Sequence, residues 1–422
     1  MNHSLAEWLA WLEGLHPSAI ELGLERVGAV WRRLHPGPVS FKVITVGGTN
    51  GKGSSVAMLE AIYRAAGFRA CAYVSPHIQR FNERIRLDGQ EAPDDLIVEA
   101  LEAVERQRGD VSLTYFEFTT LAALHLFSQH RPDVAILEVG LGGRLDAVNL
   151  LDADVVLITS IAFDHMDWLG HDLNQIAREK AGIMRAGRPC VFNGEQPVPG
   201  LVEAARERGA NLLIRGRDYQ WQAEDEGWSW RMGERCLSGL PLPRLRGRHQ
   251  LHNAAAVLAV VESLRMALPL GRDAVREGLL TAYQPCRFQV IPGDVTHVLD
   301  VAHNPEAAAV FAATLADMPC EGRTLAVFGI LGDKDAVGVV APLLGVVDHW
   351  CVAAPDTARA LAADALVEVL DSAGARAVSS HRNIGQAYGY AAEIAQDSDR
   401  IVIFGSFYTV AAVLGLMKPR QL

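Results

Sequence analysis

The sequence predicts an α/β protein of at least two domains, in which helices alternate with the strands of mostly parallel sheets. The first observation is the length, because 422 residues exceed the ~100–200 residues of an average domain. The second is that short β-branched runs alternate with amphipathic helical stretches, the pattern of βαβ units. The third is that 50% of the residues are hydrophobic, which excludes a disordered chain and allows full cores.

The net charge and the cysteine pattern indicate which cellular compartment and which binding partners to expect. A formal net charge of -11 argues against a protein that coats nucleic acid, which needs a basic surface. The six cysteines are scattered without a CxxC pair, which indicates free thiols in a reducing compartment. The first residues lack a basic signal-peptide segment, and the apolar stretch 401–417 is too short and interrupted to span a membrane. We expect a cytoplasmic monomer that binds neither nucleic acid nor a membrane.

The first series of elements occupies residues 41–266. Residues 41–46 (FKVITV) are predicted to form a strand and residues 52–66 an amphipathic helix. Further strands are expected at 134–139, 154–160 and 189–192. Between residues 211 and 246, Trp, Gly and Arg are mixed with charges, which predicts an antiparallel insertion. A helix with one apolar stripe is predicted at 250–266.

A second alternating series follows the turn Pro292-Gly293-Asp294. Strands are expected at 296–301, 324–328, 349–353 and 400–404, and helices at 305–315, 358–372 and 384–395. About 130 residues of this kind are enough for a whole domain. We therefore predict one domain at residues 1–288 and another at 289–422.

The sharpest local signal is a glycine-rich loop, GGTNGKGS at residues 47–54, between the first strand and its helix. Glycines let successive backbone N–H groups point at a phosphate chain, and the helix N-terminus adds a partial positive charge. Lys52 supplies a mobile cation for the outer phosphates. The loop departs from the GxxxxGK[ST] pattern, because Val46 stands at the position of the first glycine and Gly53 follows the lysine. A glycine-rich turn with a solvated lysine is the alternative interpretation.

Acidic and imidazole side chains follow other predicted strands. Glu138 ends an apolar run, and a carboxylate beside a triphosphate suits Mg²⁺, although a structural pair with Arg144 is the alternative. His165 lies in the same relative place after another strand, but a lone histidine is more often structural and imidazole is an unusual Mg²⁺ ligand. Taken alone, Lys180 looks like a solvated helical lysine and Ser75 like an unremarkable loop residue.

Several segments together resemble the Mur-ligase-like superfamily, and within it the folylpolyglutamate synthases. They are GGTNGKGSS, YVSPHIQRFNERI, LTYFEF, LEVGLGGRLDAVN, SIAFDHMDWLG, REKAGI, QLHNAAA, CRFQ, LDVAHNP and FGSFYTV. In this order they cover nearly the whole chain, and they look closest to the bacterial type that is both dihydrofolate synthase and folylpolyglutamate synthase. The resemblance implies a P-loop-type ATPase domain with a mostly parallel sheet, followed by a smaller, Rossmann-like C-terminal α/β domain.

The resemblance implies binding sites for ATP and Mg²⁺ at matching positions. The residues implied in nucleotide binding are Thr49, Asn50, Gly51, Lys52, Gly53, Ser54, Asn253, Arg287 and Asp300. Those implied in Mg²⁺ binding are Ser75, Glu138 and His165. Lys180 matches a lysine that the family carries as a carbamate, a modification that turns a cation into an oxygen donor. Lys52, Lys180 and His165 are therefore the expected catalytic residues.

A pterin substrate is implied at three further segments. They are Ala19, Ile20, Glu21 and Leu22; Thr114, Tyr115, Phe116 and Glu117; and Leu145, Asp146 and Ala147. An aromatic pair beside a carboxylate suits a flat ring that carries N–H groups, while the alternative is that both rings are core residues. Tyr408 departs from the family, in which relatives often have histidine at this position.

The implied reaction is the ATP-dependent ligation of L-glutamate to dihydropteroate, and then to reduced folates, through an acyl phosphate. Phosphorylation supplies a leaving group because a carboxylate is a poor electrophile, while Mg²⁺ and Lys52 neutralise charge. One alternative is a Mur ligase acting on another carboxylate, whose nucleotide-sugar domain would find little room before Gly47. Another is a nucleotide-controlled binding protein, which would form no amide product.

Overall fold

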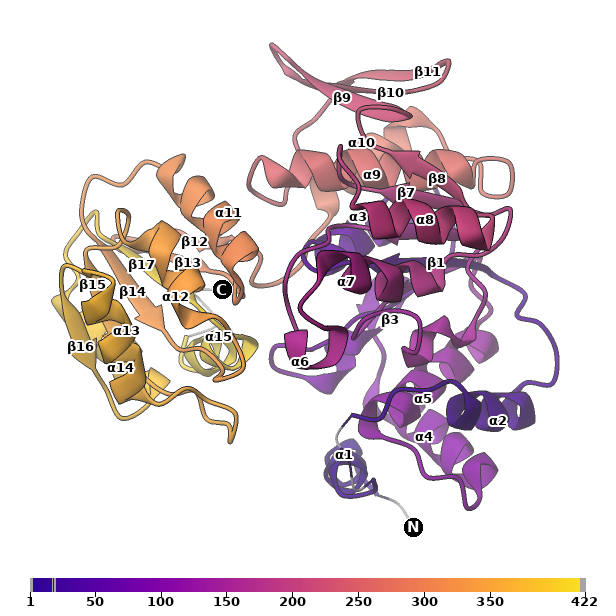
Figure 1. Ribbon diagram of the computed structural model, residues 1–422, viewed down its shortest axis with the longest axis horizontal. Helices are drawn as coiled ribbons and strands as arrows, with labels where there is room; N and C mark the ends of the chain where they lie inside the picture. The colour runs from indigo at the N-terminus through magenta and orange to yellow at the C-terminus, as the bar shows by residue number, and fades with distance from the viewer. Residues whose placement is uncertain (1–2, 17, 19, 418–422) are drawn as a thin grey trace. The chain divides into compact units, whose positions relative to one another are not determined.

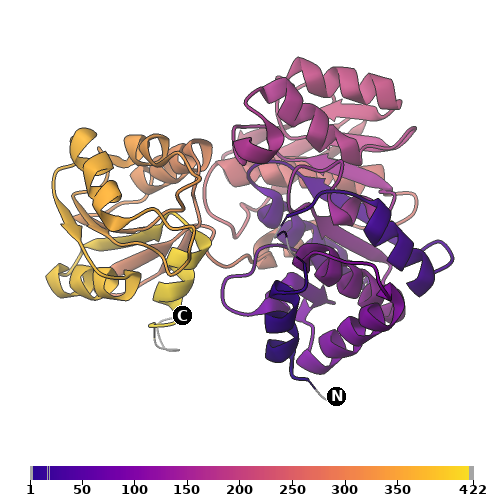
Figure 2. The ribbon, with the colours of Figure 1, turned by 60° about the horizontal axis from the view of Figure 1, so that its bottom comes forward.

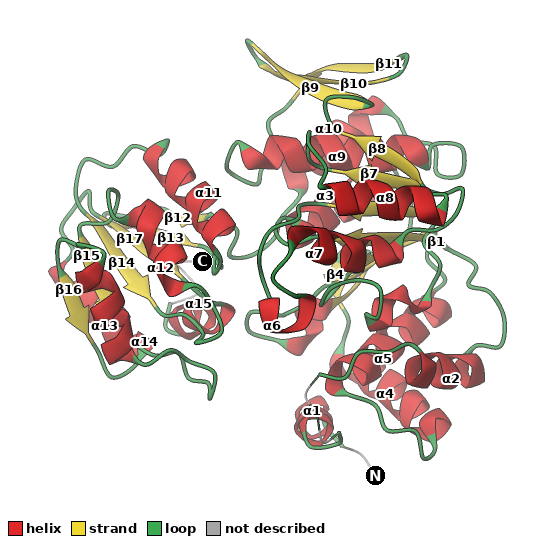
Figure 3. Cartoon of the chain, viewed as in Figure 1, coloured by secondary structure: helices red, strands yellow, loops and turns green. Residues whose placement is uncertain are grey.

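The apolar segments of the sequence form mostly parallel sheets in two separate units of the chain, and the predicted α/β fold is confirmed (Figures 1 and 3). The computed structural model describes residues 3–16, 18 and 20–417. The first unit comprises residues up to 161 together with 169–244 and 251–283. The second unit comprises 162–168, 245–250 and the chain from residue 284 onward. Among the described residues, no helix has both the length and the apolar character needed to cross a membrane.

The sheet of the first unit has the strand order β4-β3-β2-β5-β1-β6-β7-β8. Its strands are β1 (Lys42–Gly47), β2 (Ala70–Tyr73), β3 (Ile85–Leu87), β4 (Gln90–Glu91), β5 (Val134–Glu138), β6 (Val155–Ile158), β7 (Pro189–Phe192) and β8 (Asn211–Ile214). The strands from β2 to β8 in this order pair in parallel, while β3 and β4 form an antiparallel edge. β5 and β6 are buried along their whole length, as expected for parallel strands covered by helices on both faces.

Helices cover this sheet, and several candidate site residues lie in their first turns. They are α1 (Leu5–Glu13), α2 (Glu25–Leu34), α3 (Lys52–Ala65), α4 (Asp94–Arg108), α5 (Tyr115–His130), α6 (Met166–Leu169), α7 (Leu173–Lys180), α8 (Pro199–Arg208), α9 (His249–Ser263) and α10 (Arg272–Thr281), with 3-10 turns η1 (Phe81–Arg84), η2 (Ala147–Leu150) and η3 (Ala181–Ile183). α6 and α9 begin in segments that belong to the second unit. Thr114 and Glu117 form a capping box at α5, so Tyr115 and Phe116 lie in its first turn.

The predicted antiparallel insertion is confirmed, but it starts later than expected. It consists of β9 (Tyr219–Glu224), β10 (Gly227–Met232) and β11 (Arg235–Leu240), which form a small sheet beside α9 and α10 in Figure 1. Residues 211–214 were expected to belong to the insertion and instead form β8, parallel to β7. The buried Trp230 ties the insertion to α9, because its indole N–H donates to the Ala255 carbonyl oxygen at 3.0 Å.

The sheet of the second unit has the strand order β12-β13-β17-β14-β15-β16, and β12 pairs antiparallel with β13 while the other pairs are parallel. The strands are β12 (Gln289–Ile291), β13 (Thr296–Leu299), β14 (Thr324–Phe328), β15 (His349–Val352), β16 (Val378–Ser380) and β17 (Arg400–Phe404). The helices are α11 (Pro305–Ala316), α12 (Ala336–Val340), α13 (Ala363–Ser372), α14 (Ile384–Ile394) and α15 (Phe407–Leu414), with the turn η4 (Ala341–Leu343). Figure 2 shows helices on both faces of this sheet. α13 begins at Ala363 instead of residue 358, because Ala360 bridges to Leu331.

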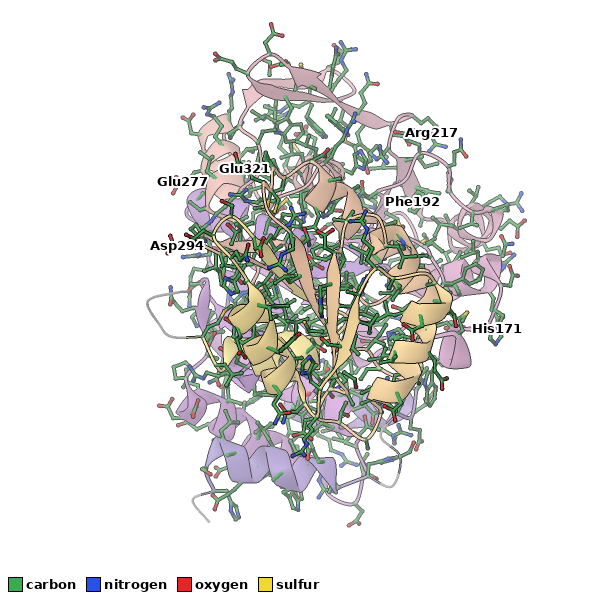
Figure 4. All side chains as sticks on the ribbon, turned by 90° about the vertical axis from the view of Figure 1, so that its left-hand side faces the viewer. His171, Phe192, Arg217, Glu277, Asp294 and Glu321 are labelled. Atoms are coloured by element: carbon green, nitrogen blue, oxygen red, sulfur yellow. The ribbon has the colours of Figure 1, made fainter. Side chains whose placement is uncertain are left out.

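The turns that precede β13, β14 and β17 lie at one edge of the second sheet. The Ser398 N–H donates to the Asp294 carbonyl oxygen at 2.9 Å, and the Gly322 N–H donates to the Ser398 carbonyl oxygen at 3.1 Å. Figure 4 labels Asp294 and Glu321 at this edge. Because the strands are parallel, the loops that follow them gather at the opposite edge, which is where open α/β sheets bind ligands.

Close packing of α10 on α3 provides a test of the fold. A Cβ atom on the buried Gly278 of α10 would lie 2.5 Å from the Ile62 Cα atom of α3, which is backbone and cannot rotate away. We expect Gly278→Ala to lower the free energy of unfolding by about 1–3 kcal/mol, the usual cost of overpacking. Gly389→Ala in α14 is the control, because its Cβ meets open space, and it should raise stability by up to about 1 kcal/mol. Urea unfolding curves check both, and equal effects would contradict this packing.

Candidate functional site

The glycine-rich loop connects the end of β1 to the start of α3 in the first unit, as predicted. Gly48 (φ +141°) and Gly51 (φ +86°) have backbone angles that favour glycine. The Thr49 N–H donates to the Ser160 carbonyl oxygen at 2.9 Å, and the Asn50 N–H donates to Ser160 Oγ at 3.0 Å. The loop is therefore held in a fixed shape by the segment that follows β6, and Ser160 is a supporting residue that the sequence did not indicate.

Lys52 and Asn253 lie at this loop. Lys52 begins α3, and its Nζ atom donates to two carbonyl oxygens of the loop at 3.1 Å each. A Cβ atom on Gly51 would lie 3.0 Å from Asn253 Oδ1, and that oxygen also accepts from Asn193 Nδ2 at 3.0 Å. The predicted phosphate loop, its lysine and Asn253 of α9 therefore meet at a helix N-terminus, where anion binding is favoured.

Two of the predicted magnesium ligands lie together in the first unit. Glu138 is buried at the end of β5, and the Ser75 N–H after the neighbouring β2 donates to Glu138 Oε2 at 3.3 Å. His165 belongs to the second unit, so its place in the same site stays a prediction. Within residues 3–16, 18 and 20–417, no three His, Cys, Asp or Glu side chains converge as metal ligands. A carboxylate with a hydroxyl still fits Mg²⁺, which takes few protein ligands when substrate phosphates complete its coordination.

Lys180 at the end of α7 is buried, with 4% of its surface exposed. The interpretation of Lys180 as a solvated helical lysine is therefore wrong. Its backbone packs on the loop after β5, because a Cβ atom on Gly143 would lie 3.1 Å from the Lys180 carbonyl oxygen. Arg144 of that loop pairs with Glu179 at 2.9 Å, so the alternative that pairs Arg144 with Glu138 is also wrong. Burial of an ammonium group is costly, and a carbamate at this position would replace it with an oxygen donor.

The aromatic and acidic residues of two predicted pterin segments meet at the loop after β5. A Cβ atom on Gly140 would lie 2.7 Å from the Phe116 ring. Asp146 Oδ2 accepts the backbone N–H groups of Gly140 at 3.0 Å and Leu141 at 2.8 Å, while Oδ1 accepts that of Val148 at 3.0 Å. Burial raises the pKa of Asp146 to about 6, although these hydrogen bonds oppose the rise. The Asp146 carboxylate thus holds the loop, and its contact with a pterin ring stays a prediction.

Arg26 connects the predicted pterin segments 19–22 and 114–117. Its Nη2 atom donates to Glu117 Oε1 at 2.9 Å, and its guanidinium also pairs with Glu21. The buried Glu117 carboxylate accepts the Thr114 N–H at 2.8 Å as part of the capping box. Ala19 lies outside the described residues. The carboxylates of Glu21 and Glu117 are therefore engaged within the protein, and Arg26 is a positioning residue that the sequence did not indicate.

Arg84 is a further residue that sequence reasoning missed. Its guanidinium carbon lies 5.6 Å from the Phe81 ring centroid and 5.7 Å from that of Tyr115. Its Nε atom donates to His77 Nδ1 at 2.8 Å. Burial, together with the charge of Arg84, lowers the pKa of His77 to about 4, so His77 is neutral at pH 7 and can accept this hydrogen bond. Tyr115 and Phe116 are only partly buried, which leaves both rings partly accessible.

Arg287 and Asp300 lie near each other in the second unit. The Asp300 carboxylate accepts the backbone N–H groups of Phe288 and Ala302 at 2.7 Å each. Burial raises the pKa of Asp300, and the charge of Arg287 opposes this rise. Arg287 stacks on the Phe407 ring at 5.3 Å, and its Nη1 atom is buried without a hydrogen-bond partner among the described residues. Such a donor suits a bound anion or hydroxyl group, as the nucleotide prediction requires.

Asp164 lies in a charged cluster of the second unit that spacing in the sequence could not reveal. Its Oδ1 atom lies 2.5 Å from Lys334 Nζ, and its Oδ2 atom lies 3.6 Å from His303 Nε2 and 3.3 Å from Asn304 Nδ2. Burial opposes ionisation, but His303, His165 and Lys334 together hold the pKa of Asp164 well below its usual range. The pair Asp164–Lys334 is separated by 170 positions, so no local pattern points to it.

Removal of the Asp164 carboxylate should lower the stability of the protein, because it leaves the buried Lys334 ammonium without its close partner. We expect Asp164→Ala to lower the free energy of unfolding by about 3–5 kcal/mol, because the Lys334 ammonium, 6% exposed, loses its close partner. Denaturant unfolding followed by tryptophan fluorescence measures this. Asp333→Ala is the matched control, because Asp333 lies 3.9 Å from Lys334 and pairs mainly with Arg359, so its loss should cost less than about 1 kcal/mol. Equal losses in the two variants would contradict the assignment.

Comparison with known proteins finds relatives along the whole chain. Residues 46–261 match the Mur ligase middle domain, and residues 286–407 match the Mur ligase glutamate ligase domain. The chain is 43% identical over 421 residues to a dihydrofolate synthase/folylpolyglutamate synthase of Escherichia coli, covering 99% of this chain and 96% of that protein. It is 39% identical over 430 residues to the protein of the same name from Haemophilus influenzae, covering 96% of each.

Solved structures agree with these relatives. The fold is similar to that of E. coli FolC in complex with DHPP and ADP, with a TM-score of 0.94 and 42% identity over 100% of this chain and 99% of that chain. It is also similar to a bifunctional folylpolyglutamate synthase/dihydrofolate synthase with Mn, AMPPNP and L-glutamate bound, with a TM-score of 0.90 and 44% identity over 98% of each chain.

Proposed function

Because the chain belongs to the dihydrofolate synthase/folylpolyglutamate synthase family, we propose that it is an ATP-dependent ligase that joins L-glutamate to dihydropteroate and to reduced folates. The observation that carries the proposal is that the glycine loop and Glu138 lie at the same end of two adjacent parallel strands. Val46 of β1 pairs with Glu138 of β5, so the glycine loop and the buried carboxylate leave the sheet side by side. A phosphate-binding loop beside an acid is the arrangement that phosphoryl transfer with Mg²⁺ requires.

The chemistry divides into phosphorylation and amide formation. The substrate carboxylate attacks the γ-phosphate of ATP to give an acyl phosphate and ADP, and the glutamate amine then displaces phosphate from the acyl carbon. The N-terminus of α3, Lys52 and those loop N–H groups that Ser160 does not hold would bind the phosphates. Glu138 and Ser75, with His165 and carbamylated Lys180 as further proposed participants, would hold Mg²⁺, which neutralises phosphate charge when bound.

The remaining assignments extend this proposal. We assign ATP and pterin binding to residues 1–288 and the glutamate-ligase domain to residues 289–422. The nucleotide contacts Thr49, Asn50, Gly51, Lys52, Gly53, Ser54, Asn253, Arg287 and Asp300, and the pterin acid contacts residues 19–22, 114–117 and 145–147. The protein acts in the cytoplasm as a monomer on small molecules and does not bind nucleic acid, which its formal net charge of -11 supports.

Product analysis tests the function. Purified protein is incubated with ATP, Mg²⁺, L-glutamate and either dihydropteroate or a reduced folate, and phosphate release is measured together with the product mass. We expect phosphate release only when both the pterin acid and glutamate are present, and a product longer by one glutamyl residue. Equal turnover without glutamate, or ATP binding without any amide product, would contradict the proposal.

A further inference from the structure

The loop between β2 and β3 is organised by one carboxylate. Glu83 accepts the backbone N–H groups of Ile78, Gln79 and Arg80 at 2.7 Å each. Three hydrogen bonds to one ionised group fix the course of this loop. Arg84 follows directly, at the end of η1 and the start of β3, so its backbone position is determined by the same contacts.

Arg84 carries its positive charge into an aromatic setting. Its guanidinium lies over the rings of both Phe81 and Tyr115, whose centroids are 6.4 Å apart. Its Nε atom donates a hydrogen bond to His77. Neither of its terminal nitrogens has a hydrogen-bond or ion-pair partner in the part of the chain that the structure describes. By contrast, Arg86 in the following strand β3 pairs with the buried Glu60 at 2.7 Å. Arg84 therefore keeps a free planar edge of N–H donors, the group that binds a carboxylate through two parallel hydrogen bonds.

The surroundings of Arg84 are those of the proposed pterin site. Tyr115 is adjacent to Phe116, and the Phe116 ring lies 6.2 Å from that of Tyr73, so the rings extend as one cluster. Among the described residues, Glu117 and Asp146 form no ion pair with Arg84, and their oxygens accept from Arg26 and from backbone N–H groups. The cluster thus offers flat apolar surfaces and one unused cation.

We propose that Arg84 binds a carboxylate of the pterin-bearing acid substrate while Phe81 and Tyr115 hold its guanidinium in place. This inference rests on the proposed function, since it names a binding residue for the same substrate. The carboxylate has two possible sources: the aminobenzoate carboxylate of dihydropteroate, or the α-carboxylate of the glutamyl tail of a folate. Both are planar carboxylates, and a guanidinium recognises them in the same way.

A comparison of charged and neutral ligands tests the proposal. Binding of pteroic acid and of its carboxamide is measured by calorimetry on the full chain with AMPPNP and Mg²⁺, for the wild type and for Arg84→Gln. We expect the wild type to prefer the acid by about 10- to 100-fold, the range for a hydrogen-bonded charge pair, and Arg84→Gln to lose that preference while binding the carboxamide unchanged. Arg80→Gln is the matched control, because this exposed arginine of the same loop makes no contact with the rings, and it should behave as the wild type.

A second pair of ligands separates the two sources. Pteroylglutamate is compared with pteroyl-4-aminobutyrate, which lacks only the α-carboxylate. Loss of the preference in the first pair assigns Arg84 to the aminobenzoate carboxylate, and loss in the second pair assigns it to the tail. Unchanged preferences in both pairs, or loss of carboxamide binding in Arg84→Gln, would overturn the proposal. Failure of the proposed function is distinguishable, because the wild type itself would then form no glutamyl product.

Discussion

Lys52→Ala should reduce the ligation rate by at least about 10²–10³-fold while leaving the affinity for dihydropteroate nearly unchanged. Lys52 begins α3 beside the glycine loop, and its Nζ atom already lies within 3.1 Å of two loop carbonyl oxygens. The variant loses the cation proposed to neutralise the transferred phosphoryl group. Loss of one such electrostatic contact in a water-excluded site typically lowers the rate by about 10²–10³-fold. Phosphate release measures the rate, and calorimetry measures the binding of dihydropteroate.

Lys42→Ala is the matched control for this result. Lys42 lies at the opposite end of the same strand, β1, where it pairs with Asp154 at 3.1 Å and is 40% exposed. Its loss should leave the rate within about twofold, since an exposed ion pair contributes little. A Lys52→Ala protein with normal turnover would remove the glycine loop from the mechanism.

Lys180→Ala should lose most of its activity, and small carboxylates such as acetate should restore part of it. The side chain is 4% exposed at the end of α7, against the loop that follows Glu138, so its replacement by alanine leaves a buried space and removes the group proposed to carry the carbamate oxygens. We expect a loss of about 10- to 100-fold or more, the range for removing groups that support a metal site. Phosphate release is measured across an acetate series at constant ionic strength.

Arg178→Ala on the same helix provides the comparison. Arg178 is 44% exposed and pairs with Glu203 and Glu207, so this variant should keep full activity and should not respond to acetate. If Lys180→Ala is fully active without any additive, no carbamate is needed. If its activity is lost but its unfolding midpoint has also collapsed, Lys180→Met, which retains the buried apolar stem, distinguishes a packing role from an oxygen donor.

Local patterns predicted the elements of the second unit well. β14 and β17 occupy the expected ranges 324–328 and 400–404. A short apolar run bounded by polar residues indicates a buried strand, whichever strand it pairs with. The assignment of residues 211–214 to the antiparallel insertion was wrong for a related reason. A short strand looks alike in both settings, and only the neighbouring β7 decides that β8 is parallel.

The glycine loop was also recognisable from sequence, since glycine itself permits the positive φ angles found at Gly48 and Gly51. The burial of a charged side chain and its pairing partner cannot be recognised from the sequence in this way. Lys180 looked solvated by composition, yet the fold encloses it, and the sequence did not show that Asp146 accepts backbone N–H groups of its own loop.

The amino-acid sequence by itself thus determined the alternating α/β architecture, the phosphate loop and the family. The tertiary structure alone decided which charged groups are enclosed and what they contact, as in the Asp164–Lys334 pair and in Arg84 between two aromatic rings. The physical reason is range: a backbone turn or an apolar period depends on neighbours within a few residues. The environment of a charge depends on side chains that only folding brings together from distant parts of the chain.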